Sequence, residues 1–195
     1  MPRAGLTTDR LVAAAADMAD EAGLDAVTIS ALARRFGVKD ASLYSHVANV
    51  RDLRTRMALL ASRELADRLG EAVQGRAGKD ALKAFADAYR EFMLSHPGRY
   101  AAMQVRIAPE ALAAAPGADA DGPRRVIETT GALFRGYELS DPDLTDAVRL
   151  LRSTFHGYAS LEAIGGFDHP RDVQASWERA VDALDFLLRN WSRAK

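Results

Sequence analysis

The stretch TISALARRFGVKDASLYSHVANVRDL, residues 28–53, decides the fold of this chain. Its apolar and small residues are spaced as in a helix-turn-helix, in which two short helices cross at a tight turn and the second enters the major groove of DNA. Thr28 is a good N-cap for the first helix, since its hydroxyl can accept a free N–H of the first turn. Ala33 is small enough for a close crossing, and a glycine placed like Gly37 most often adopts the left-handed conformation that ends a helix.

The second helix of the pair is expected over residues 41–47. Either Asp40 or Ser42 can cap it, while Leu43 and Val47 lie four residues apart and face inward. An ordinary αα-hairpin would also contain a small residue and a glycine at this spacing, but the complete pattern favours a DNA-binding unit. The side chains expected to point outward are those of Lys39, Ser42, Tyr44, Ser45 and His46.

A series of motifs from about residue 11 to residue 57 carries a family resemblance. In chain order they are Glu21-Ala22-Gly23-Leu24, Val27-Thr28-Ile29, Leu32-Ala33, Phe36-Gly37-Val38 and Ser42-Leu43-Tyr44-Ser45-His46-Val47, followed by Asn49, Arg51 and Leu53. This part of the chain resembles the N-terminal domain of the tetracycline-repressor (TetR) family of bacterial transcription regulators. The resemblance covers roughly the first third of the chain.

The resemblance implies roles for individual side chains. It places Thr28, Tyr44 and His46 on DNA phosphates, which set the register of the protein on the duplex. Many relatives use a lysine for a phosphate where this chain has Val50, and the neighbouring Arg51 is expected to substitute for it. The residues that the resemblance places against base edges or the adjacent backbone are Ser30, Lys39, Asp40, Ala41, Ser42 and Ser45. Since Ser30 is short where some relatives have a longer base reader, the operator cannot be copied from a relative.

Composition and charge agree with a small regulator. The chain of 195 residues contains no cysteine, so disulfides and thiolate chemistry are excluded. It has neither a membrane-length apolar run nor an apolar signal segment, so we expect a cytoplasmic protein without a membrane partner. The net charge is −1, but residues 28–56 hold six basic side chains against two acidic ones, so that stretch carries +4 and the remainder −5. A basic patch on an acidic body favours specific duplex recognition.

Apolar residues recur at intervals of three and four throughout, which predicts an all-α fold. We expect a helix-turn-helix domain of three helices over residues 1–49 and a helical ligand-binding and dimerisation domain over residues 50–195. The alanine-rich stretch over residues 109–122 is expected to be a mobile loop. The helices are predicted near residues 8–22, 29–36, 41–47, 50–73, 79–95, 100–107, 123–137, 142–164 and 171–191.

The last two predicted helices are apolar over a wide arc, which indicates a four-helix interface between two copies of the chain. A monomer core would explain the same pattern, but a two-fold homodimer also matches a palindromic operator. The residues predicted for this interface are Leu151, Tyr158, Leu161, Trp177, Val181, Leu184 and Leu188.

A small-molecule pocket is expected between these helices and the middle of the chain, because its aromatic and methionine side chains suit a largely apolar effector. Core packing would explain each residue singly. The segment Phe155-His156-Gly157-Tyr158 also resembles a ligand-binding C-terminal domain named for a Trp-His-Gly signature, with phenylalanine in place of tryptophan. The predicted pocket residues are Tyr89, Phe92, Met93, Tyr100, Met103, Phe134, Phe155 and His156.

The alternatives to a regulator are an enzyme or metal protein and a protein-interaction module. An enzyme or metal protein is disfavoured because His46, His96, His156 and His169 lack the spacing of a metal site, and no phosphate loop or nucleophile motif is present. We therefore predict no catalytic residue, metal or cofactor. A relative that serves as a protein-interaction module without operator binding remains the alternative. The leading hypothesis is a homodimeric repressor that a small, largely apolar effector releases from a palindromic operator in double-stranded DNA.

Overall fold

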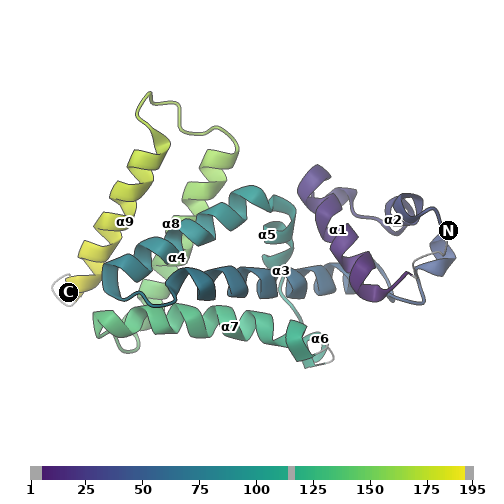
Figure 1. The fold of residues 1–195 in the computed structure, drawn as a ribbon, viewed down its shortest axis with the longest axis horizontal. Helices are drawn as coiled ribbons and strands as arrows, with labels where there is room; N and C mark the ends of the chain where they lie inside the picture. Colours follow the sequence, from purple (N-terminus) through teal and green to yellow (C-terminus); the bar gives the residue numbers. More distant parts are fainter. Residues whose placement is uncertain (1–5, 114–116, 192–195) are drawn as a thin grey trace. The chain divides into compact units, whose positions relative to one another are not determined.

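The computed structural model describes residues 6–113 and 117–191, and every regular element within these ranges is helical (Figure 1). The predicted all-α fold is confirmed. The α-helices are α1 (Thr8–Ala22), α2 (Ile29–Phe36), α3 (Val50–Val73), α4 (Gly78–Ser95), α5 (Pro97–Met103), α6 (Pro109–Ala113), α7 (Gly117–Phe134), α8 (Asp143–Ala163) and α9 (Val173–Arg189). Short 3-10 turns are η1 (Leu24–Ala26), η2 (Asp40–Ser42) and η3 (Arg135–Tyr137).

The chain forms two compact units. Unit 1 consists of residues 1–65 and 95–125, and unit 2 of residues 66–94 and 126–195. Unit 1 thus contains α1, α2, the first part of α3, α5 and α6, together with the start of α7. The predicted domain boundary between residues 49 and 50 stays a prediction, and α3 contributes residues to both units.

Unit 1 is built around a single apolar cluster in which α1 and α2 meet the start of α3. Leu11, Leu32 and Leu53 are fully buried there. Ala33 is also buried, as expected where two helices cross closely. Gly37 ends α2 in the left-handed conformation with φ of 65°, which confirms the predicted helix stop.

Helix α5 packs on α1 with almost no space between the backbones. A Cβ atom added to Gly98 would lie 2.0 Å from the carbonyl carbon of Ala19, closer than any side chain can approach. Ala102, one turn further along α5, is fully buried in the same apolar cluster as α1. The glycine therefore brings the first turn of α5 into direct contact with the last turn of α1.

The second helix of the predicted pair is shorter than expected. Residues 40–42 form the 3-10 turn η2 and residues 43–46 continue as turns, so the expected α-helix over residues 41–47 is wrong in its type. Neither Asp40 nor Ser42 caps this turn with a side chain. The stretch is rich in serine, aspartate and aromatic residues, which are weak helix formers, and Ser45 donates a hydrogen bond to the carbonyl of Ser42 at 2.9 Å.

Unit 2 has an aromatic core contributed by α4, α8 and α9. The ring of Phe155 contacts Phe85, Tyr89 and Trp177 at centroid distances of 6.4, 5.7 and 5.5 Å. Helices α8 and α9 lie side by side and are joined by the loop at the top of Figure 1. Each predicted helix of this unit is present. The ends of α4, α8 and α9 are displaced by no more than two residues, whereas α7 begins six residues earlier than predicted.

Residues 109–113 and 117–122 are helical, contrary to the prediction. The mobile loop predicted over residues 109–122 is wrong in its described part, since residues 109–113 form α6 and α7 begins at residue 117. Alanine, the strongest helix former, dominates this stretch and outweighs its glycines and prolines. Among the described residues, no helix is both long and apolar enough to cross a membrane.

Candidate nucleic-acid interface

The segment from Lys39 to His46, here called the recognition segment, is divided sharply between buried and exposed side chains. Leu43 and Val47 lie 0% and 2% exposed in the core of unit 1. Tyr44 is 55% exposed, although it directly follows a fully buried leucine. The other residues predicted to face DNA are exposed except for His46, which is half-buried; they are Thr28, Ser30, Lys39, Asp40, Ala41, Ser42, Ser45 and Arg51.

Thr28 precedes α2 and serves as its N-cap, as predicted. Its hydroxyl oxygen accepts a hydrogen bond from the backbone N–H of Ala31 at 3.1 Å. Because a hydroxyl is both donor and acceptor, its hydrogen remains available for an outside acceptor such as a phosphate oxygen. The cap thus orders the start of α2 and keeps a donor at the surface.

Ser30 and Asp40 form a direct link between α2 and the recognition segment. The Ser30 hydroxyl donates a hydrogen bond of 2.5 Å to the Asp40 carboxylate. Both side chains are exposed, and within the described residues the Asp40 carboxylate accepts from no other donor. A carboxylate held in this way is suited to accept from a base amino group, as carboxylates do from cytosine N4.

The start of α3 is capped by its own sequence. The Asn49 side-chain oxygen accepts from the N–H of Asp52 at 2.9 Å, and the Asp52 carboxylate accepts from the N–H of Ala48 at 2.8 Å. Arg51 lies between them and is exposed. This cap therefore places a cation at the surface on the first turn of α3.

Several cations of the basic stretch are engaged in ion pairs within unit 1. Arg35 pairs with Glu21 at 3.0 Å, and Arg56 with Asp52 at 3.0 Å. Arg54 pairs with an aspartate and also donates to a backbone carbonyl. Within the described part of the chain, the basic side chains of this stretch without such a partner are Arg34, Lys39 and Arg51. The charge that remains open for DNA is smaller than the sequence count suggests.

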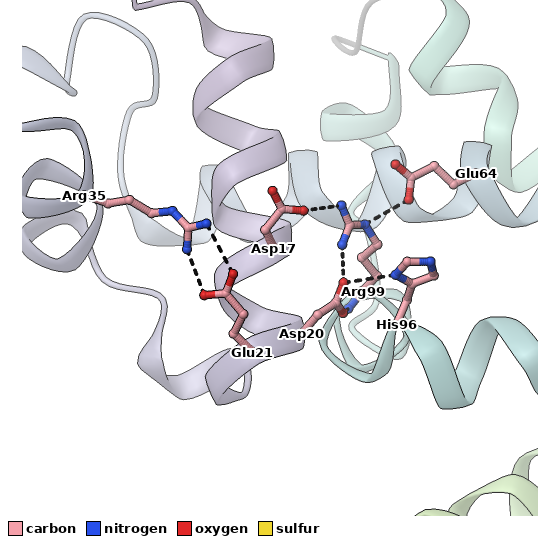
Figure 2. A network of polar contacts seen from close by, with 7 residues as sticks. All are labelled: Asp17, Asp20, Glu21, Arg35, Glu64, His96 and Arg99. Carbon is pink, nitrogen blue, oxygen red and sulfur yellow. Dashed lines mark hydrogen bonds and ion pairs between the residues drawn. The ribbon is translucent and has the colours of Figure 1, made fainter.

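A network of ion pairs centred on Arg99 connects α5 to α1 and α3 (Figure 2). The guanidinium of Arg99 pairs with Asp17 at 2.7 Å, with Glu64 at 2.9 Å and directly with Asp20. The backbone N–H of Arg99 also donates to the Asp20 carboxylate at 2.8 Å, and Nδ1 of His96 lies 3.3 Å from the same carboxylate. The network therefore holds α5 to the helix that supports the helix-turn-helix.

The electrostatics of this network favour a permanent charge on Arg99. Burial by itself lowers the pKa of the guanidinium, because it penalises the charged form. The hydrogen bond to Asp17, the charge of Glu64 and the contacts with Asp20 outweigh burial, so the pKa of Arg99 is raised. The guanidinium of Arg99 thus stays charged throughout the physiological range of pH.

The sequence did not point to this network. Asp17, Asp20 and Glu64 occupy ordinary positions on amphipathic helices. Arg99 follows a proline and a glycine, which by themselves predict only a break between helices. The contacts join residues 79 and 82 positions apart in the chain. The local signal was Gly98, which directly precedes Arg99, because a glycine in a helix allows another backbone to approach closely.

The residues predicted for the ligand pocket are divided between the units. Tyr100 and Met103 lie on α5 in unit 1. His156 is exposed on α8. The remaining residues, which are buried in unit 2, are Tyr89, Phe92, Met93, Phe134 and Phe155. The structure therefore brings only part of the predicted set into one unit.

Most of the residues predicted for a dimer interface lie inside a single chain. Leu151, Trp177, Val181, Leu184 and Leu188 are buried in unit 2, so they have almost no surface left for a second copy. Tyr158 is half-buried and Leu161 is exposed. The large apolar side chains that do remain exposed on α8 and α9 are Leu161 and Phe186. The sequence pattern described the inner face of these helices.

Comparison with known proteins decides the family. The family model for bacterial regulatory proteins of the tetR family matches residues 11–54, and the model for the tetracyclin repressor-like C-terminal domain matches residues 82–184. The chain belongs to the TetR family. The predicted resemblance is confirmed, and the second match extends it over more than half of the chain.

Individual relatives agree with this assignment. The HTH-type transcriptional regulator Rv0681 of Mycobacterium tuberculosis is 35% identical over 170 residues, which make up 85% of this chain and 74% of that protein. The HTH-type transcriptional regulator YobS of Bacillus subtilis is 28% identical over 190 residues, or 97% and 93%. The crystal structure of the TetR family protein ActR from Streptomyces coelicolor, in complex with (S)-DNPA, has a TM-score of 0.66 and 21% identity, covering 95% of this chain and 98% of that one.

Membership of the TetR family makes this chain a DNA-binding transcriptional regulator of the helix-turn-helix type. It also confirms the prediction that the protein is not an enzyme, since the matched families and relatives are regulators. The surface made by Thr28, Ser30 and the recognition segment is the candidate DNA interface.

Proposed function

We propose that this TetR-family protein is a homodimeric repressor that binds a palindromic operator and is released by a small, largely apolar effector. The observation that carries the proposal is the division of the recognition segment, in which Leu43 and Val47 are buried while the polar side chains around them are exposed. In this proposal Thr28, Tyr44 and His46 contact phosphates, with Arg51 in support. Ser30, Lys39, Asp40, Ala41, Ser42 and Ser45 face the base edges.

The first experiment is selection of duplexes from a random library by the purified protein, followed by a salt titration of the selected duplex. The proposal predicts an enriched palindrome whose affinity falls steeply with salt, because bound phosphates release counterions. Tyr44→Phe removes only the hydroxyl that would reach a phosphate, so it is expected to weaken all duplexes alike. Ser42→Ala is expected to change the preference at one base position. Weak binding without sequence preference would favour the protein-interaction module instead.

Dimerisation is proposed to use the outer face of α8 and α9. Phe186 is 70% exposed on α9, so its ring is available to pack against a second copy. Phe186→Glu is expected to convert the dimer into a monomer, as measured by analytical ultracentrifugation. Ile127→Glu is the matched control, because Ile127 is 71% exposed but lies on α7. Dissociation by both variants, or by neither, would contradict this placement.

The effector is proposed to bind the buried aromatic residues of unit 2. The ligand complex of ActR is a property of that protein, but it shows that the fold can hold a small molecule. Helix α3 spans about 36 Å at 1.5 Å per residue and belongs to both units, so a shift at its far end can reach the first turn of α3. The protein is proposed to act in the cytoplasm, where its DNA is.

A further inference from the structure

A pocket of about 760 Å³ lies within unit 1, between the start of α3 and residues 105–111. This volume falls in the range of roughly 300–1,000 Å³ that is usual for small-molecule sites. The pocket adjoins the cap of α3, on which Arg51 is exposed. It contains none of the residues predicted for an effector site.

Some charged side chains that line the pocket are already engaged. Arg54 pairs with Asp25 at 3.4 Å, and Arg56 with Asp52 at 3.0 Å. Asp52 also accepts the N–H of Ala48. Because the charges of Arg54, Arg56 and Asp52 are already neutralised by ion pairs, they do not determine the charge of a ligand.

Two other arginines of the lining are different. Arg51 and Arg106 are exposed, and neither side chain has a hydrogen bond or ion pair within the described residues. The remaining acid of the lining is Glu110, so the open charge is positive in excess. A guanidinium presents a planar fork of N–H donors that fits a carboxylate or a phosphate. The charges therefore favour an anion.

The rest of the wall is apolar. Leu59 is 2% exposed and lies beneath the pocket, while Val50, Val105 and Ala108 contribute further aliphatic surface. Val105 is 52% exposed, so its side chain is accessible to a ligand in the pocket. An aliphatic wall beside two open cations suits a ligand that is itself apolar at one end and anionic at the other.

We propose that this pocket binds an anionic amphiphile, whose carboxylate or phosphate head contacts Arg51 and Arg106 and whose apolar body lies against Leu59 and Val105. The proposal rests on the proposed function only where it concerns Arg51. Arg51 is also the expected partner of a DNA phosphate, so the ligand and the operator would compete for the same guanidinium.

The test is calorimetric titration of the full chain with decanoate, without DNA and below the concentration at which decanoate forms micelles. Decanoate is expected to bind, whereas acetate, which lacks the apolar body, and decan-1-ol, which lacks the charge, bind at least about tenfold more weakly. Arg106→Ala is expected to weaken decanoate about tenfold by removing one of the two cations. Ala108→Trp is expected to weaken decanoate binding by placing a bulky ring in the pocket.

Arg135→Ala is the matched control, because Arg135 is also exposed but lies in unit 2. It is expected to bind decanoate like the parent chain, and thermal melting checks that each variant is folded. Absence of decanoate binding, or equal affinity in the parent, Arg106→Ala and Ala108→Trp, overturns the proposal. Since the titration contains no DNA, its failure leaves the duplex selection unaffected, and failure of the selection leaves this result standing.

Discussion

The helix-turn-helix and the aromatic core of unit 2 are held by contacts of very different reach along the chain. In the helix-turn-helix, Thr28 caps a residue three positions away, and Gly37 ends α2 through its own backbone conformation. In unit 2, Arg90 pairs with Glu162 across 72 positions, and Trp177 donates to Asp87 across 90. The first region is specified by neighbours in sequence, whereas the second depends on the folded chain.

The largest expected effect tests the distant contacts of unit 2. Trp177 is fully buried, lies under the Arg90 guanidinium at 5.2 Å, and donates to Asp87 at 2.7 Å. Trp177→Ala is expected to destabilise the protein by about 3–5 kcal/mol, because it opens a large cavity and removes a hydrogen bond. Urea unfolding measures this change. Ile127→Ala, an exposed control in the same unit, is expected to change stability little, and a similar loss in both variants would contradict the assigned core.

A smaller effect is expected from the network that joins α5 to α1. Arg99 is 9% exposed, and Arg99→Ala would leave Asp17, Asp20 and Glu64 without their shared cation. Since two of these carboxylates are partly solvated, we expect a loss of about 2–3 kcal/mol, below that of a fully buried pair.

Arg35→Ala provides the comparison for Arg99→Ala. Arg35 pairs with Glu21, and both side chains are exposed, so the loss is expected to stay within the small range of surface ion pairs. Chemical denaturation of both variants decides the matter. If Arg99→Ala were no more harmful than Arg35→Ala, the network would be a surface feature and not a clamp on α1.

The left-handed conformation of Gly37, which ends α2, is expected to be sensitive to a single added methyl group. Gly37 has φ of 65°, and a Cβ added there would meet nothing within 4 Å. Gly37→Ala is therefore expected to destabilise by about 1 kcal/mol through backbone strain alone. Thermal unfolding measures this effect. Gly37→Asn tolerates the left-handed conformation better and is expected to recover part of the loss; a full loss in Asn would point to a steric cause.

The smallest effect concerns an exposed pair of unit 2 and depends on pH. The hydrogen bond from Lys79, at 2.8 Å, lowers the pKa of Asp182 below its ordinary value of 3.8. A carboxylate whose pKa is lower in the folded state stabilises the protein above that ordinary value, and the contribution is lost as the pH falls through the folded pKa. Asp182→Asn is thus expected to lower the unfolding temperature slightly at pH 6 but not at pH 2. A difference that persisted at pH 2 would have another origin.

The accuracy of the sequence predictions follows the same division. The ends of α1, α2 and α3 match their predicted ranges, because caps, a helix-ending glycine and helical periodicity are local properties. The inward orientation of Leu43 and Val47 was also predicted correctly. The recognition segment was assigned the wrong helix type, since its short polar sequence only weakly favours an α-helix.

The outer and inner faces of α8 and α9 could not be separated from the sequence. The apolar arc of these helices is wide, and periodicity alone does not say which part of it meets the chain's own core and which part meets a second copy. Packing against α4 and α8 decides it, placing Trp177 inside and Phe186 outside. Because most of the predicted interface residues are buried in the chain's own core, the proposed interface uses the exposed Phe186 on the outer face instead.

The sequence by itself determined the family, the all-helical fold and the surface proposed to contact DNA, because each depends on motifs within a few tens of residues. Only the tertiary structure decided which cations remain open, that Arg99 joins α5 to α1, and that Arg51 and Arg106 share one pocket. These features depend on side chains that are distant in the chain and adjacent in space. Such adjacency is produced by packing, and no local pattern encodes it.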